Sequence, residues 1–551
     1  MQQDVMNEKQ LRAIAPQRSS RSLHHALLIA AATICCGLLV WQTFGLGQNM
    51  QHPSVIRSRQ VTDDDISTYP GEHIQWEPCG QVDHRPLECS SIAVPKDQFN
   101  PSNFDNETFN IPLVRMRGKN ATQNLLVNPG GPGGSGFAFM YGDALEIMRV
   151  IDESFHLLSF DPRGVNSSRP LATCYPDQET RKRLPEIKAT DPSADSPEVY
   201  AWTTNFAHAC SDTMGESGKY INTPQTAADM NNILDAVGQK DMAYWGFSYG
   251  SILGQTYATM FPDRSKRVII DGIASHFDWY GALIEDKDFI DSEKVLYGIF
   301  DECVKAGANC TLSALADTSE ELYQKFMDFT AQIQAEPVSV YVNNSLYGVL
   351  DYHSLWFNGV YRALYRPSGW YSFTDRLAKL MQGDATEAFL AYGFGDPFTR
   401  IGDGDIVIHL NDGPSGSEHW PQERTKLLDQ LLPWYANSSF AFSQNKLYYA
   451  KQQWRIPRTH TFKPRQNVET AHPLLVLSMT FDPVCPLASA KVATESFKGS
   501  RLVEVKGYGH CSQAMESSCA ATHIRNFLQK GVLPDNHVQC EVDNKYYVKP
   551  E

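Results

Sequence analysis

Three residues far apart in the chain have the side chains of a nucleophilic serine site. Ser248 lies in the sequence GFSYG, Asp482 lies in SMTFDPVCP, and His510 lies in GYGHCS. A serine hydroxyl alone is a poor nucleophile, because it needs a base that takes its proton and an acid that orients the base. The GFSYG pattern by itself is common by chance. Its weight therefore depends on where the three residues fall in the fold.

Six short apolar runs bounded by turn residues predict the buried strands of a parallel sheet. They span residues 125–128, 156–160, 242–245, 267–270, 474–478 and 501–505. Ser248 follows the third run and precedes a helical stretch at 251–261, which is the strand–turn–helix setting of a nucleophile elbow. Asp482 and His510 follow the last two runs. Because the carboxyl ends of parallel strands meet at one edge of a sheet, we expect these side chains to converge.

A glycine-rich segment, LLVNPGGPGGSGF at 125–137, follows the first predicted strand. Its five glycines give a backbone that can approach a substrate closely and direct amide N–H groups at an oxyanion. A phosphate-binding loop is the rival interpretation. The segment lacks the G-x-x-x-x-G-K-[ST] pattern, however, and Pro132 removes a backbone donor. We therefore expect an oxyanion hole.

Five motifs in this order resemble the proline-iminopeptidase and tripeptidyl-aminopeptidase branch of the serine α/β-hydrolases, in its secreted forms with a TAP-like C-terminal region. The motifs are NPGGPGGSG, FDPRGVNSS, GFSYGSILGQTYATMFPDRSKRVIIDG, FDPVCPL and GYGHCS, and the resemblance covers residues 71–540. It implies an α/β-hydrolase fold with a mostly parallel central sheet and an inserted helical cap. It also implies Ser248 as nucleophile, Asp482 and His510 as its acid and base, and the Gly131 and Tyr249 amides as oxyanion donors.

The resemblance further implies a cap that admits short peptides and senses a free amino terminus with carboxylates. No motif identifies these carboxylates, so Glu285, Asp286, Asp288 and Glu293 remain unranked candidates. The same branch includes fungal enzymes that act on small secondary metabolites, so the resemblance does not fix the substrate.

The order of predicted elements divides the chain into a core interrupted by a cap. The first part of the core spans 71–274, the helical cap spans 275–421, and the second part of the core spans 422–551. Within the cap, Leu322, Phe326, Phe329 and Ile333 share one helical face behind a capping box that begins at Thr318.

An uncharged stretch of 21 residues at 26–46 is long enough to cross about 30 Å of hydrocarbon. A leader at 1–25 precedes it and contains Lys9, Arg12, Arg18 and Arg21, and a linker at 47–70 follows. Basic residues before the span favour a cytosolic amino terminus. We expect a type II signal-anchor with a lumenal or extracellular catalytic part. The alternative is a secreted protein released by signal-peptide cleavage.

Cysteines and glycosylation sequons agree with the secretory pathway. Outside the apolar stretch, ten cysteines form an even set without a C-x-x-C pair, which favours disulfides over a metal site. We expect Cys485–Cys511, because a working acid–base pair would bring these two loops together. Proximity suggests Cys79–Cys89, Cys174–Cys210, Cys303–Cys310 and Cys519–Cys540 as the other pairs. Sequons occur at Asn106, Asn120, Asn166, Asn309, Asn343 and Asn437.

Composition narrows the classes of function. The chain is globular, with 42% hydrophobic and 20% charged residues, and its formal charge of -15 argues against a nucleic-acid partner. The sequence thus predicts a serine hydrolase that needs no cofactor or metal and removes amino-terminal residues from short peptides. An esterase or amidase acting on a non-peptide small molecule is the alternative. A silent hydrolase fold serving as a binding module is a third. The sequence does not indicate an oligomeric state.

Overall fold

The structure is a computed structural model that describes residues 71–549, apart from 105, 120, 185, 186, 188, 190 and 395–401. The predicted leader, membrane span and linker lie outside the described residues. Within the described ranges, no helix has the length and apolar character needed to cross a bilayer.

A ten-stranded sheet forms the centre of this part, with the strand order β1-β2-β3-β5-β4-β6-β7-β10-β11-β12. The first three strands are antiparallel, and the run from β5 to β12 is parallel. The strands are β1 (Glu77–Val82), β2 (Arg85–Pro95), β3 (Thr108–Met116), β4 (Asn124–Asn128), β5 (His156–Phe160), β6 (Met242–Phe247), β7 (Ser265–Asp271), β10 (Leu475–Phe481), β11 (Arg501–Tyr508) and β12 (Val538–Glu541).

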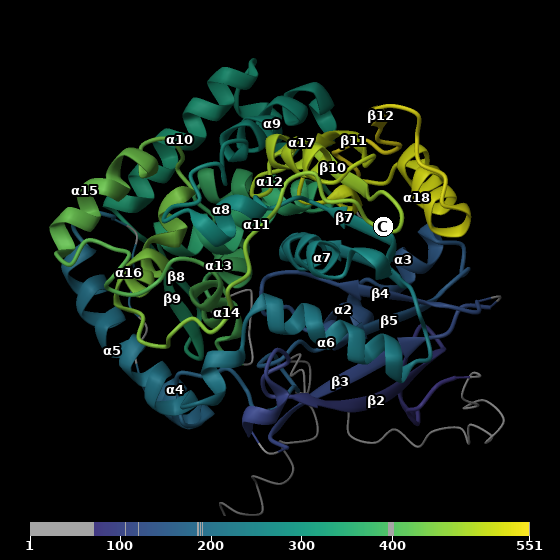
Figure 1. The fold of residues 1–551 in the computed structure, drawn as a ribbon. Helices are drawn as coiled ribbons and strands as arrows, with labels where there is room; N and C mark the ends of the chain where they lie inside the picture. Colours follow the sequence, from purple (N-terminus) through teal and green to yellow (C-terminus); the bar gives the residue numbers. More distant parts are fainter. Residues whose placement is uncertain are drawn as a thin grey trace, which may run out of the picture. The chain divides into compact units, whose positions relative to one another are not determined.

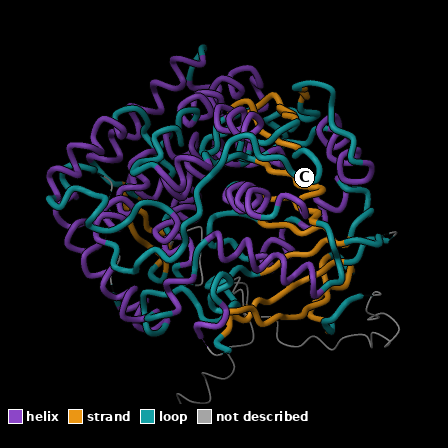
Figure 2. Tube along the Cα trace, viewed as in Figure 1, coloured by secondary structure: helices purple, strands orange, loops and turns teal. Residues whose placement is uncertain are grey.

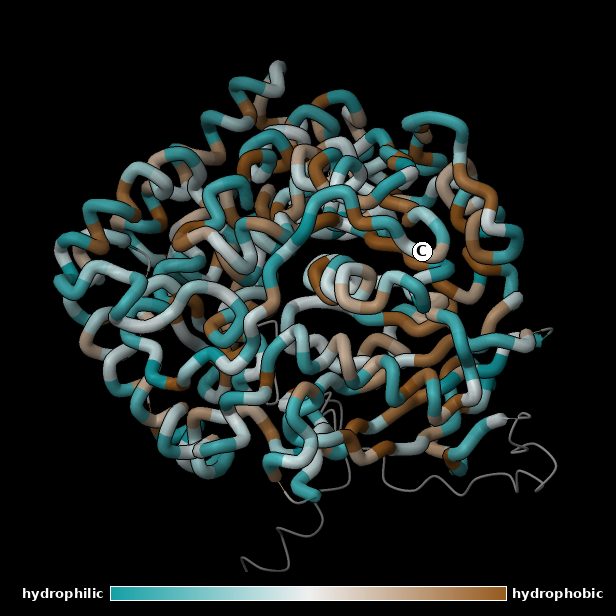
Figure 3. The backbone as a smooth tube through the Cα atoms, in the orientation of Figure 1, coloured by the Kyte–Doolittle hydropathy of each residue, from teal (hydrophilic) through white to brown (hydrophobic). Residues whose placement is uncertain are grey.

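All six apolar runs predicted from the sequence overlap parallel strands of this sheet. Every residue of β4, β5 and β6 is buried, as expected for strands covered on both faces. Figure 3 shows the resulting hydrophobic backbone segments within the sheet. The sequence analysis did not predict the antiparallel edge β1–β3 or the last strand β12.

Helices cover both faces of the sheet. Helices α6 (Thr223–Ala236), α7 (Tyr249–Met260) and α17 (Leu487–Ser496) contribute to one hydrophobic cluster. Helices α2 (Gly136–Gly142), α3 (Ala144–Val150) and α18 (Ser518–Lys530) contribute to a second cluster. Along each central strand, the residues of this cluster alternate with those of the first. Leu126 belongs to the first cluster, and its neighbours Leu125 and Val127 belong to the second. The two layers follow from the alternation of side chains along a strand.

A helical cap lies between β7 and β10 in the chain and has a hydrophobic cluster of its own (Figures 1 and 2). It contains α8 (His276–Gly281), α9 (Ser292–Ala306), α10 (Ser319–Ala335), a π-helix (Ser354–Val360), α11 (Tyr361–Tyr365), α12 (Trp370–Met381), α13 (Thr386–Tyr392), α14 (Gly404–Asp412), α15 (Arg424–Tyr435) and α16 (Asn445–Gln453). Thr318 caps α10 through the amide of Glu321, as predicted.

The helical segment differs from the prediction in three respects. It continues past the expected boundary at 421, because α15 and α16 pack in the cap cluster. An earlier helix, α5 (Ser196–Met214), packs against α16, and the short helix α4 (Gln178–Arg183) precedes it. A hairpin of β8 (Val338–Asn343) and β9 (Leu346–Leu350) interrupts the helices.

Disulfides join four of the five predicted pairs: Cys79–Cys89, Cys174–Cys210, Cys303–Cys310 and Cys519–Cys540. Four sequon asparagines are exposed, namely Asn106, Asn309, Asn343 and Asn437. Asn120 lies outside the described residues. Asn166 is only half-exposed, and its side-chain amide donates to Asp161 at 2.7 Å. The Asn166 amide is therefore poorly placed to accept a glycan.

Candidate active site

Ser248 occupies a strained turn between β6 and α7. Its backbone has φ 56° and ψ -124°, a conformation that L residues rarely adopt. The Ser248 N–H donates to the carbonyl oxygen of Asp271 at 2.9 Å, which ties the turn to the end of β7. The turn needs glycine at position 250, because a Cβ there would lie 2.7 Å from the carbonyl oxygen of Asn128. This geometry is that of a nucleophile elbow.

Asp482 and His510 lie together at the ends of β10 and β11. His510 Nδ1 is 2.9 Å from both carboxylate oxygens of Asp482. The carboxylate is fully buried, and it also accepts the backbone N–H groups of Cys485 and Cys511, each at 2.9 Å. These donors hold the carboxylate facing Nδ1. The other nitrogen, Nε2, is then left to accept a proton.

Ser248 lies beside this pair. Its N–H and the Cys511 sulfur both approach the carbonyl oxygen of Asp271, at 2.9 and 3.7 Å. The Cys485 sulfur, an Asp482 oxygen and a His510 ring nitrogen all lie within 4.8 Å of one another. The structure therefore brings the three predicted residues into one site at the carboxyl edge of the sheet.

The predicted bridge between Cys485 and Cys511 is wrong, because both cysteines are free and buried. Their backbones approach different oxygens of Asp482. The Cys511 sulfur lies 3.7 Å from the carbonyl oxygen of Asp271, whereas the Cys485 sulfur lies in the cluster with Asp482 and His510. The two loops do meet, but they direct their sulfur atoms to different partners. Burial, reinforced by nearby carboxylates, raises the pKa of both thiols well above the usual range.

The glycine-rich segment lies directly against the elbow. A Cβ built on Gly130 would lie 2.9 Å from the Ser248 Cβ and 3.0 Å from the Tyr249 nitrogen. Tyr249 is the first residue of α7, so its N–H has no acceptor within the helix. Gly130 and the Tyr249 amide thus lie beside Ser248, and Gly131 directly follows Gly130 in the chain. The roles of the Gly131 and Tyr249 amides as oxyanion donors stay predictions.

A buried acid that the sequence analysis did not identify supports this segment. Ser135 caps α2 by accepting the N–H of Ala138, and its hydroxyl donates to Asp161 at 2.7 Å. The Asn166 amide donates to the other oxygen of Asp161. Burial raises the pKa of Asp161 despite these donors. The FDPRGVNSS motif therefore braces the glycine-rich segment.

Comparison with known families agrees with this geometry. Residues 123–298 match the family model described as alpha/beta hydrolase fold, and residues 441–540 match the one described as TAP-like protein. The chain thus contains regions similar to both families, and the resemblance predicted from the sequence is confirmed. The α/β-hydrolase fold with a mostly parallel central sheet is confirmed as well, whereas the predicted membrane helix lies outside the described residues.

Three curated relatives extend over most of this hydrolase. Serine protease Hip1 of Mycobacterium tuberculosis is 26% identical over 492 residues, which cover 85% of this chain and 91% of the relative. A tripeptidyl aminopeptidase of Streptomyces lividans is 25% identical, with 85% and 86% covered. Carboxylesterase B of Mycobacterium tuberculosis is also 25% identical, with 84% and 89% covered. The fold and these relatives make the chain a serine hydrolase.

The cap of the hydrolase contacts His510 directly. The backbone N–H of His510 donates to the carbonyl oxygen of Tyr365, the last residue of α11, at 2.9 Å. The Tyr365 ring meets the imidazole edge to face, with 4.8 Å between the ring centroids. A Cβ on Gly509 would lie 2.9 Å from Pro367 and 3.1 Å from the Tyr365 carbonyl oxygen, so this position leaves no room for a side chain. The cap thus fixes the loop that carries His510, a role that no sequence motif indicated.

The four candidate cap carboxylates differ in their surroundings. Asp286 is exposed, and Glu293 accepts the N–H of Ser439 at 2.8 Å. Glu285 is buried and is paired with Lys451 at 2.6 Å and with His409 at 3.1 Å. Although burial opposes ionisation, these partners hold the pKa of Glu285 well below its usual range.

Asp288 is the exception among the four. The residue keeps some exposed surface, but its Oδ1 is buried and has no hydrogen-bond partner. Burial and the charge of Glu285 raise the pKa of Asp288 well above its usual range. The charge of an ionised Asp288 would act on the thiol of Cys485. Among the four candidates, Asp288 is the one with a buried carboxylate oxygen that has no hydrogen-bond partner.

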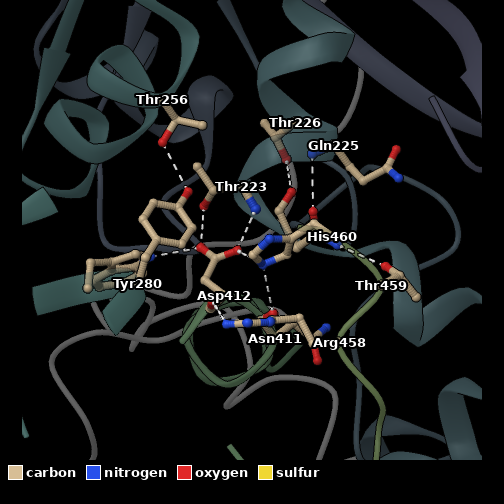
Figure 4. A network of polar contacts seen from close by, with 12 residues as sticks. Thr223, Gln225, Thr226, Thr256, Tyr280, Asn411, Asp412, Arg458, Thr459 and His460 are labelled. Carbon is tan, nitrogen blue, oxygen red and sulfur yellow. Dashed lines mark hydrogen bonds and ion pairs between the residues drawn. The ribbon is translucent and has the colours of Figure 1, made fainter. Parts of the chain in front are cut away.

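A buried polar network surrounds Asp412 (Figure 4). Asp412 accepts the Thr223 N–H at 2.8 Å, the Thr223 hydroxyl at 2.5 Å and the Trp279 ring N–H at 2.8 Å. The Thr223 hydroxyl also bonds the phenol of Tyr249. Burial raises the pKa of Asp412 to about 7. The network anchors the side chain of the residue whose amide is the predicted oxyanion donor.

Proposed function

We propose that this serine hydrolase is an exo-aminopeptidase that releases residues from the free amino terminus of short peptides. Ser248 Oγ attacks the scissile carbonyl carbon, and His510 Nε2 takes the serine proton. The amides of Gly131 and Tyr249 stabilise the oxyanion of the tetrahedral intermediate. His510 then gives its proton to the leaving amine. Water hydrolyses the acyl-enzyme with the same imidazole as base.

The observation that carries this proposal is the unpartnered oxygen of Asp288. A protonated substrate amine would supply the hydrogen bond and the positive charge that this carboxylate lacks. Glu285 cannot serve in this way, because Lys451 and His409 already occupy it. The names of the relatives, serine protease and tripeptidyl aminopeptidase, agree with a peptide substrate.

The test is a pair of peptide amides that differ only in acetylation of the amino terminus. Losing a charge-assisted pair of this kind costs about 2–5 kcal/mol, or roughly 30- to 4,000-fold in kcat/KM. We expect the free peptide to be preferred by more than about thirtyfold near neutral pH. Equal rates, or a preference for the blocked peptide, would exclude recognition of the amine.

The alternative function is hydrolysis of a non-peptide ester or amide. The raised pKa of Asp288 favours it, because a neutral carboxyl group in the empty site needs no cationic partner. One relative is named carboxylesterase B. A panel of simple esters assayed beside the peptide amides separates the two functions.

We also propose a type II orientation, with the catalytic part in an oxidising compartment. Four disulfides and four exposed sequon asparagines in the described part support this proposal. Full-length protein in sealed microsomes should resist added protease over the catalytic part and shift in mass on deglycosylation. If protease removes the catalytic part and leaves only the amino terminus protected, the orientation is the reverse.

A further inference from the structure

The catalytic centre contains an unusual combination of metal-binding side chains. A carboxylate oxygen of Asp482, the sulfur of Cys485 and a ring nitrogen of His510 lie within 4.8 Å of one another. Ligand atoms in a tetrahedral zinc site are separated by about 3.3–3.6 Å, given bonds of about 2.0–2.3 Å. Shifts of about an ångström would therefore let these three atoms share one ion.

The local charges favour a cation at this position. The carboxylates of Asp482, Asp288 and Asp271, when ionised, act electrostatically on the Cys485 sulfur. Asp482 and Cys485 are buried, so water screens these charges weakly. Asp288 also has an oxygen without a hydrogen-bond partner. Negative charge on these carboxylates disfavours an isolated thiolate at Cys485. When the thiolate binds a divalent cation, the same negative charge stabilises the complex.

We propose that Asp482, Cys485 and His510 form an inhibitory site for a thiophilic divalent cation, with zinc as the type ion. On binding, the S–H bond of Cys485 is replaced by an S–Zn bond, and the thiol proton passes to solvent. Thiolate and imidazole ligands select zinc or cadmium over magnesium and calcium, which prefer oxygen ligands. This inference rests on the proposed roles of Asp482 and His510 in catalysis.

Binding of the cation to either ring nitrogen of His510 prevents the imidazole from acting as the catalytic base. A metal on Nε2 occupies the lone pair that must accept the Ser248 proton. A metal on Nδ1 displaces the N–H that Asp482 holds, and the remaining ring proton then sits on Nε2. In both cases, the imidazole can no longer deprotonate the serine.

Cys511 provides a matched control for the activity test. It is also free, buried and bonded to Asp482 through its amide, but its sulfur lies toward the Asp271 carbonyl oxygen. Each variant is compared with its own metal-free activity. We expect zinc to inhibit the wild type and Cys511→Ser with similar affinity, EDTA to restore activity, and Cys485→Ser to lose at least about tenfold in apparent zinc affinity. Equal zinc sensitivity in wild type and Cys485→Ser would overturn the proposal.

A direct measurement of metal binding tests this site independently of the proposed catalytic role of Ser248. Cadmium is titrated into Ser248→Ala, and the ultraviolet charge-transfer band of a cadmium–thiolate bond is recorded. We expect a band at one equivalent that is absent from the Ser248→Ala/Cys485→Ser double variant. If the band is absent from Ser248→Ala, or persists in the double variant, the metal site is refuted, whatever the activity assays show about the serine.

Discussion

Buried carboxylates in the α/β core and in the helical cap receive different numbers of hydrogen bonds. In the core, the Asp482 carboxylate is hydrogen-bonded to the imidazole and accepts three backbone N–H groups before any substrate arrives. In the cap, Asp288 has a buried oxygen with no donor at all. Asp482, with its donors in place, positions the imidazole, whereas the unpartnered oxygen of Asp288 can accept a hydrogen bond from a substrate. The difference separates the machinery of the reaction from the selection of its substrate.

The cap also contains both kinds of carboxylate three residues apart. Lys451 and Tyr448, both on α16, bond Glu285 at 2.6 Å each, so this acid fastens the segment after α8 to α16. Asp288 lies one turn later without such partners. Only the second is suited to bind a substrate, and the predictions below test this contrast.

Removing the nucleophile has the largest expected effect. Ser248→Ala should lose at least about 10³ in turnover, because nucleophile and base act as a unit. Labelling by a fluorophosphonate probe should disappear as well. Ser251→Ala, a change at the next serine of the same helix, should retain labelling. A labelled Ser248→Ala protein would refute the assignment.

Removing the negative charge of Glu285, which is paired with Lys451 in the cap, should lower the free energy of unfolding. Glu285→Gln leaves Lys451 buried without its counter-charge, and such a loss costs about 3–5 kcal/mol. Chemical denaturation of both proteins at neutral pH measures the difference. A loss below about 1 kcal/mol would mean that Lys451 finds another partner or water.

The matching change at Asp288 should affect recognition instead. Asp288→Asn should lower kcat/KM for the peptide amide with a free amino terminus by about 30-fold or more, and change the acetylated compound little. Its unfolding free energy should stay within about 1 kcal/mol of the wild type, because the buried oxygen of Asp288 has no partner that would lose a hydrogen bond. Parallel losses on both substrates would assign Asp288 a structural role.

Weakening the polar network around Asp412 should have a moderate effect. Thr223→Val preserves shape but removes the hydroxyl that joins Asp412 to Tyr249. We expect kcat to fall about 3- to 10-fold with KM nearly unchanged, since a loss of about 1 kcal/mol is typical for one such bond. A change confined to KM would contradict a role in positioning the Tyr249 amide.

The smallest expected effect is on the pH dependence of the unfolding free energy. The folded pKa of Asp412 is about 7, above its usual 3.8, so the folded state binds more protons and loses stability as pH rises toward 7. His156 and His460, with pKa values of about 4, act oppositely between pH 4 and 6.5. Because these contributions oppose each other, the comparison with Asp412→Asn isolates Asp412: between pH 6 and 7.5, the wild type should lose about 1 kcal/mol of unfolding free energy relative to this variant. Identical pH profiles for the two proteins would rule out a raised pKa at Asp412.

Local patterns in the sequence determined the framework of this protein. Apolar runs bounded by turns marked six parallel strands, since burial on both faces requires continuous hydrophobic residues. The glycines around Ser248 and in residues 130–136 marked the elbow and the glycine-rich segment, because only glycine permits such close backbone approach. Asp482 and His510 could be placed because each directly follows a strand.

Tertiary structure alone decided which side chains meet. Glu285 finds Lys451 across 166 positions, and Thr223 finds Asp412 across 189, and no periodic pattern encodes such distances. Cys485 and Cys511 show the same limit, because the sequence placed their loops together but could not give the direction of each sulfur. That direction depends on backbone torsion and on packing against Ser248 and Asp271. Segment position is a local property, whereas side-chain partnership depends on the packing of the whole fold.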